Sequence, residues 1–232
     1  MNKVIRAEFG RTINAGLIIA IAGIIFSICF DSFNDLIAGL RNGQGYVGYF
    51  FSNAAFGGMC THYMLPVFTA LPFSVSLCQE RNNKAVSYIV SREGKNRYIF
   101  AKFIVSAISG GFVAACGTVL LFLMLAMRFP IAGDEFEGAV VSDYFHEWSA
   151  VYYPQLYILT LSILAFCRGV IWSSLALCVS LYTSDFMVVL LSPFLGSYVL
   201  VRIFQIIRVP DMVRPDMILI CLLYTSDAAD EL

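Results

Sequence analysis

The side chains that carry most catalytic and metal-binding chemistry are few in this chain and are not spaced for it. Its two histidines, His62 and His146, are far apart, and its seven cysteines form no CxxC pair and no cluster with histidine. Because the cysteines stand in or beside apolar runs, we interpret them as packing residues. The GxxxxGK[ST], HExxH and GxSxG motifs do not occur. We therefore expect no enzyme activity, catalytic residue, metal site or cofactor.

The segment with the most informative pattern is 79–102, QERNNKAVSYIVSREGKNRYIFAK, which holds six basic and two acidic residues. Basic loops of membrane proteins stay on the cytoplasmic side and contact anionic lipid, which explains the charge. It does not explain Val86, Ile89 and Val90, whose i, i+3, i+4 spacing predicts one apolar face of a short helix. A short helix tethered between two spans has a suitable shape for docking a partner.

The elements that position this segment are predicted to be membrane helices. Of 232 residues, 59% are apolar and only 13% are charged, against ~25% charged in soluble domains. These charges are too few to build a polar surface, so lipid must surround most of the chain. We predict an all-α polytopic transmembrane helix bundle, a single domain over residues 1–220, with five complete spans and a truncated sixth.

The predicted spans are apolar runs long enough to cross a hydrocarbon core of ~30 Å. They are 13–30, 56–78, 103–127, 156–181 and 187–207, and the sixth, 217–220, is cut short.

Three local patterns refine these predictions. Pro66 and Pro72 predict a kink in the second run. Ser106, Gly110 and Ala114, four residues apart in the third run, predict that another helix approaches closely there. The basic segment 1–11 is predicted to lie along the membrane surface as an amphipathic helix.

The distribution of charge predicts the orientation. With the N-terminus in the cytoplasm, the inner segments hold nine basic and four acidic residues, a net charge of +5. The outer segments hold four basic and nine acidic residues, a net charge of −5. The excess of Lys and Arg inside predicts a cytoplasmic N-terminus.

Arg168 is the one charged residue deep inside a predicted span, and an intramembrane arginine is a functional candidate. Alternatively, it is structural, bonded to hydroxyls or carbonyls of neighbouring spans or placed at a helix break beside Gly169. Arg202, near the outer end of its span, is interpreted as an anchor that reaches the headgroups. No Asp or Glu lies inside the five runs, which counts against a proton-coupled transporter.

The segment 79–102 resembles the loop between spans two and three of type-2 ATP-binding cassette exporter permeases. The residues that carry the resemblance are Glu80, Lys84, Tyr88, Arg92, Gly94, Arg97, Tyr98 and Lys102. In that family an acidic residue ends the second span, a short coupling helix follows, and a lysine opens the third span. The flanking LPVFTALPFSVSLCQE and SAISGGFVAACG resemble small permeases of Gram-positive bacteria, and segment 1–11 resembles the family's elbow helix. Ser91 departs from the family, in which a proline often precedes the arginine.

The resemblance implies a multi-pass permease subunit of a bacterial plasma membrane, which exports a substrate as a homodimer or heterodimer with a second permease. A separate ATP-binding subunit would hydrolyse ATP, and no nucleic acid is expected as a partner. The implied ATPase-docking loop comprises Glu80, Lys84, Val86, Tyr88, Ile89, Val90, Arg92 and Arg97. The alternatives are a stand-alone secondary transporter or channel, and a membrane sensor or assembly protein that transports nothing.

The segment Cys221–Glu231, CLLYTSDAADE, resembles the translation of a sequencing adapter. As part of a span its acids would cost ~2.5–3.5 kcal/mol for each central Asp. We therefore expect residues 221–232 to be a non-native tail, the alternative being a genuine acidic tail left outside.

Overall fold

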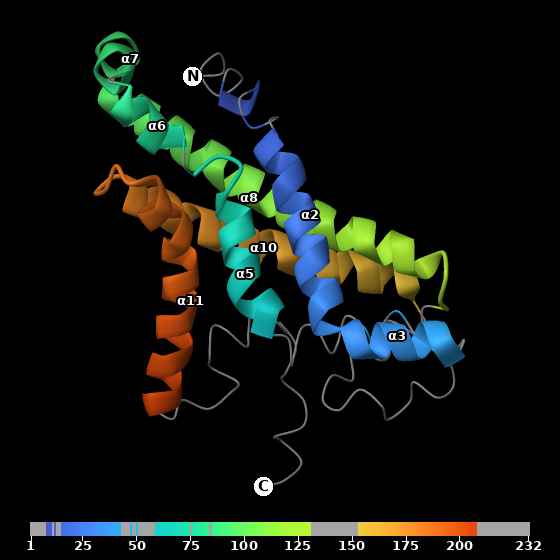
Figure 1. The fold of residues 1–232 in the computed structure, drawn as a ribbon. Coiled ribbons are helices and arrows are strands. Elements are labelled where there is room, and N and C mark those ends of the chain that lie inside the picture. Colours follow the sequence, from blue (N-terminus) through green and yellow to red (C-terminus); the bar gives the residue numbers. More distant parts are fainter. Residues whose placement is uncertain are drawn as a thin grey trace, which may run out of the picture.

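The computed structural model describes residues 8–10, 12, 15–42, 47, 50, 59–74, 76–83, 85–130 and 153–207. Within these ranges all regular secondary structure is helical. The helices, labelled in Figure 1, are α2 Ala15–Asp31, α3 Phe33–Asn42, α5 Met59–Ala70, α6 Ser76–Asn82, α7 Ala85–Glu93, α8 Lys95–Ala126, α10 Pro154–Ser180 and α11 Phe186–Ile207.

Three helices are long and apolar enough to cross a membrane, at 95–126, 155–180 and 186–204, and Ala15–Asp31 is a shorter apolar helix. The predicted all-helical class is therefore confirmed for the described residues, while five complete spans are not. Predictions for the truncated sixth run and for the tail at 221–232 lie outside the described residues, as does most of segment 1–11.

The core is organised around α8 and α10, which pack along each other through small residues. A Cβ atom added to Gly169 would lie 2.4 Å from the backbone oxygen of Gly110, and one added to Gly110 would lie 2.4 Å from the Ser173 side chain. Ser106 also donates a hydrogen bond of 3.2 Å to the backbone oxygen of Ser173. The close helix approach predicted from the small residues of the third run is confirmed.

The second apolar run is broken, not merely kinked, which corrects the prediction of one span over 56–78. Helix α5 ends at Ala70, residues 71–74 form a turn, and α6 begins at Ser76. Pro72 lies in that turn and has no N–H with which to continue the helix. The Ser74 hydroxyl holds the turn in place. It donates a hydrogen bond to Ser173 O at 3.1 Å and lies 3.1 Å from Ser106 Oγ.

Three further features differ from the prediction. Helix α8 begins at Lys95, so residues 95–102 form a helix continuous with the third span and not a loop. Tyr98 and Ala101 are buried there, and this packing extends the helix. The polar connection after α2 contains the helix α3. Helix α10 runs through Arg168 without interruption, so the suggested helix break at this point is wrong.

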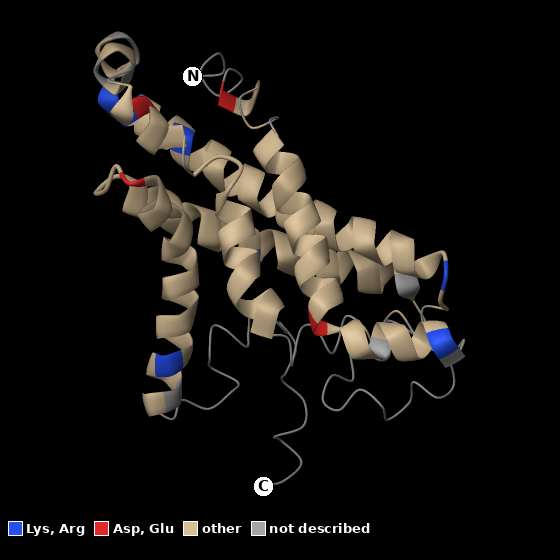
Figure 2. Cartoon of the chain, in the orientation of Figure 1, with Lys and Arg blue, Asp and Glu red and all other residues tan. Residues whose placement is uncertain are grey.

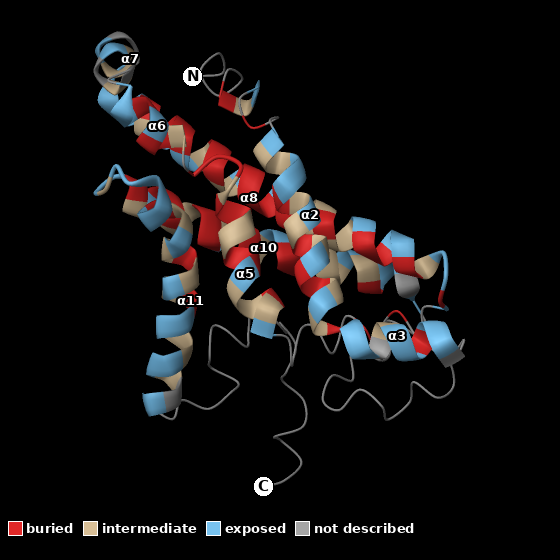
Figure 3. Ribbon diagram, in the orientation of Figure 1, coloured by how far each residue is buried: buried red, intermediate tan, exposed pale blue. Residues whose placement is uncertain are grey.

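The outer surface of the bundle is apolar. Ile18 of α2 and Ile206 of α11 are 70% and 80% exposed, and Figure 3 shows exposed residues along the outward sides of both helices. The visible charged residues lie toward the ends of the helices (Figure 2). Such a surface is compatible with a protein embedded in a membrane.

Candidate functional site

The candidate site lies at the end of the molecule where α6, α7 and the start of α8 meet (Figure 1). Helices α7 and α8 are separated by Gly94, whose φ of 85° lies in the left-handed region that favours glycine. The Gly94 N–H donates to Val90 O at 2.9 Å, and the Tyr98 N–H donates to Gly94 O at 3.2 Å. The turn therefore joins two helices without a flexible linker.

The predicted apolar face of α7 exists, but it is turned toward the protein. Val86, Ile89 and Val90 are partly buried against a cluster of Leu77, Tyr98 and Leu177. Intramolecular packing thus accounts for the apolar pattern that suggested docking of a partner. The three residues therefore help to hold α7 in position, and each is only partly buried.

The exposed side of this region carries other members of the predicted docking loop. Tyr88 is 78% exposed on α7, and Arg97 is exposed on the first turn of α8. Lys84 and the side chain of Arg92 lie outside the described residues. We call the exposed side chains of Tyr88 and Arg97 the α7 tip.

Glu80, also predicted for the docking loop, lies in a buried ion cluster that also contains Lys102 and Glu8. The Lys102 ammonium is 2.7 Å from Glu80 Oε1 and 2.9 Å from Glu8 Oε2. It also donates to Ser76 Oγ at 3.2 Å. All three charged side chains are at most 8% exposed, so Glu80 is not accessible to a partner protein.

Aromatic rings complete the surroundings of the cluster. The Tyr98 hydroxyl donates a hydrogen bond to Glu80 Oε2. The Lys102 ammonium lies 4.8 Å from the centre of the Phe73 ring, within cation–π range. The cluster therefore joins the N-terminal segment, the turn before α6, α6 itself and α8. The cluster is not predicted by the sequence patterns above, although charges at the borders of apolar runs are a signal for it.

Arg81 fixes the same region to the end of α10. Its guanidinium donates hydrogen bonds to Ser180 O at 3.2 Å and Leu181 O at 3.0 Å. Carbonyl oxygens at the end of a helix have no partner within the helix, and a cation stabilises them. The short helices α6 and α7 are thus attached to both α8 and α10.

Arg168 lies far from this site, in the middle of α10. It is 14 residues after Pro154 and 12 before Ser180, so it lies roughly 18 Å or more from either helix end. It is partly buried. Within the described part of the chain, no hydrogen bond or ion pair involves its guanidinium. The structural interpretation, an arginine bonded to neighbouring spans, therefore has no support among these residues.

Among the described residues, no group of three His, Cys, Asp or Glu side chains is placed to hold a metal ion. No protein-family model matches the chain, and the searches of curated proteins and of solved structures gave no match. The family resemblance of the loop therefore stays a prediction.

Proposed function

We propose that this chain is the transmembrane permease subunit of an ATP-driven exporter in a bacterial plasma membrane, with ATP hydrolysed by a separate subunit. The observation that carries the proposal is the α7 tip, formed by Tyr88 on the short helix α7 and Arg97 on the first turn of α8. Tyr88 of α7 and Arg97 of α8 are exposed, whereas the apolar side of α7 packs inward. A surface of this kind can receive a force without unfolding.

The connections of the tip favour transmission of that force to the spans. Helix α8 has 32 residues, which rise ~48 Å against a hydrocarbon core of ~30 Å. Its first turns would therefore project beyond the core and form a rigid arm below α7. The ion cluster at Lys102 and the bonds of Arg81 to the end of α10 attach this arm to other helices. A displacement of α7 would move α8 and α10 together.

The orientation in this proposal places α7, α6 and the N-terminus in the cytoplasm. Its support is the charge split of +5 against −5 between the two sides of the predicted topology. A permease of this type would pair with a second copy or a related permease. The export of a substrate follows from the family resemblance of the loop.

The test is co-purification with an ATP-binding subunit. We expect a reading frame with a phosphate loop beside the gene for this chain. The protein that this reading frame encodes is co-expressed as the partner. Tyr88→Ala and Arg97→Glu should each reduce recovery of the partner at least fivefold, because both side chains lie on the exposed tip. Arg41→Glu, an exposed arginine of α3 toward the other end, is the matched control and should change nothing.

Point substitutions are preferred to deletion of α7, because deletion would also remove packing against α6 and α8. If the wild-type chain retains no ATP-binding partner, the proposed function is wrong. If Tyr88→Ala and Arg97→Glu retain it as fully as Arg41→Glu does, docking at the α7 tip is wrong.

A further inference from the structure

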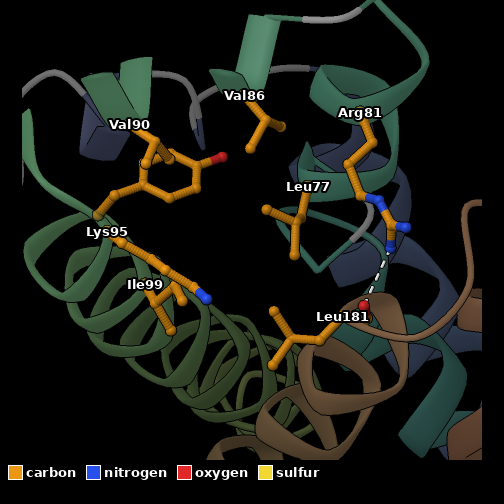
Figure 4. A pocket seen from close by; sticks show the side chains of 8 residues that line it. Leu77, Arg81, Val86, Val90, Lys95, Ile99 and Leu181 are labelled. Atoms are coloured by element: carbon orange, nitrogen blue, oxygen red, sulfur yellow. Dashed lines mark hydrogen bonds between the residues drawn. The ribbon is translucent and has the colours of Figure 1, made fainter. Parts of the chain in front are cut away.

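A pocket with a cavity volume of about 580 Å³ lies beneath α7, between α6, α8 and the end of α10 (Figure 4). Ligand sites of proteins have volumes of ~300–1,000 Å³, so this space is large enough for part of a lipid. Its walls are mainly aliphatic and include Leu77, Val86 and Ile99. The packing of α7 onto its neighbours thus leaves an apolar hollow open.

Two cations line this pocket, and no acid is among the described residues that line it. Figure 4 shows Lys95 extending across the pocket, with its ammonium nitrogen toward the centre, and the Arg81 guanidinium on the far side. Lys95 is exposed, and within the described residues it has no ion pair. Arg81 bonds two backbone carbonyls at the end of α10, and within the described residues it forms no ion pair.

The level of the pocket relative to the helices indicates where its ligand comes from. Leu181 directly follows the end of α10, and Ile99 precedes the apolar run that begins at Phe103. The pocket therefore lies where the apolar runs end, which is the headgroup level of a bilayer. Basic pockets between helices on the cytoplasmic side are typical sites for anionic lipid headgroups.

We propose that this pocket binds one anionic phospholipid of the cytoplasmic leaflet. The lipid phosphate lies between Lys95 and Arg81, and the glycerol and the start of an acyl chain lie on Leu77 and Val86. A docked segment of the ATPase fits this place less well, because the exposed surface of α7 is at Tyr88, on the side away from the pocket. The inference rests on the membrane placement proposed above and not on the ATPase.

The lipid also has a structural consequence for the proposed coupling. It would contact α6, α7, α8 and the end of α10 at once, since each contributes lining residues. A bound lipid would fill the space beneath α7 and limit its movement toward α8. The anionic lipid content of the membrane would then set how stiffly the α7 tip is supported.

The test is native mass spectrometry of the purified full chain in detergent, with phosphatidylglycerol and phosphatidylcholine added in equal amounts. We expect the wild type to retain one phosphatidylglycerol in clear preference to phosphatidylcholine. Lys95→Glu should lower phosphatidylglycerol retention at least fivefold, and Lys95→Arg should preserve it. Val90→Trp, which places a large ring in the pocket, should abolish retention of both lipids. Arg41→Glu has the same change of charge outside the pocket and should behave as wild type.

Circular dichroism and size-exclusion profiles identify any variant that fails to fold, and the proposal is then judged on the remaining variant of the pair Lys95→Glu and Val90→Trp. Equal retention of the two lipids by the wild type would overturn the proposal, as would unchanged retention in folded Lys95→Glu or Val90→Trp. Displacement of the lipid by millimolar glycerol phosphate would show that the acyl chains are not recognised and would overturn it too. Displacement by the ATPase would assign the pocket to the partner. If the wild-type chain retains phosphatidylglycerol but no ATPase, the proposed function is refuted and the lipid proposal is not.

Discussion

Removal of the Lys102 ammonium should strongly destabilise the protein. The side chain of Lys102 is 2% exposed and those of Glu8 and Glu80 are 8% exposed, so all three charges are withdrawn from solvent. Lys102→Met leaves both carboxylates without the cation that each contacts within 3 Å. Loss of one partner of a buried ion pair costs ~3–5 kcal/mol of unfolding free energy, against ~0–1 kcal/mol for an exposed pair.

The assay is unfolding of the purified protein in lipid-free detergent, followed by circular dichroism. Lys95→Met is the matched control, because Lys95 lies seven residues earlier on the same helix and is exposed. Its effect should be within ~0.5 kcal/mol, as for most surface substitutions. If Lys102→Met lowers the unfolding free energy as little as Lys95→Met does, the inference that the cluster is buried and paired is wrong.

A double-mutant cycle separates the ion pair from other effects of the substitution. Glu80→Gln removes the carboxylate charge that lies 2.7 Å from the Lys102 ammonium. Contacting residues show coupling free energies of ~0.5–3 kcal/mol, whereas independent sites add within ~0.3–0.5 kcal/mol. Combined with Lys102→Met, Glu80→Gln should therefore cost less than the sum of the two single changes. Additive costs would show that the two side chains are not in contact in the folded protein.

Three further predictions use the same unfolding measurement. Arg168→Met should not lower stability, because no described group pairs with the guanidinium; a loss of ~3–5 kcal/mol would instead identify a structural arginine. Gly169→Ala should cost ~1–3 kcal/mol, because its Cβ would lie 2.4 Å from Gly110 O, and an unchanged stability would contradict the tight α8–α10 contact. Gly94→Ala should cost ~1–2 kcal/mol, since its φ is 85° while nothing lies within 4 Å of the added Cβ, and a neutral effect would contradict the turn.

Apolar runs and small-residue spacing predicted the long helices well because both depend on local sequence. Helices α8, α10 and α11 end within a residue of the predicted runs, and Gly110 lies in the predicted close contact. The break at Pro72 was less predictable, because a proline in a membrane helix can kink it or end it. The outcome depends on what satisfies the neighbouring polar groups, here the hydroxyl contacts of Ser74 with α8 and α10.

The helix α7 shows a second limit of sequence reasoning. The i, i+3, i+4 spacing of Val86, Ile89 and Val90 correctly predicted one apolar face. Periodicity reports that a face is buried, but not whether the cover is the same chain or a partner. Because α6, α8 and α10 partly cover this face, the proposed partner surface lies on the opposite side, where Tyr88 is exposed.

The basic residues of the loop show why charge patterns predict topology better than function. All of them count equally in the rule that assigns the cytoplasmic side. In the structure, Lys102 is buried in an ion cluster, Arg81 bonds the end of α10, and Lys95 extends over an apolar pocket. Arg97 alone among these four is exposed without lining the pocket. Burial and neighbours divide the four cations between stability, the proposed lipid site and the proposed docking surface, and only part of these surroundings lies in the loop itself. The rest lies in α10, in the N-terminal segment and in the turn before α6, so a substitution in those distant segments should alter the role of a loop cation without changing the loop sequence.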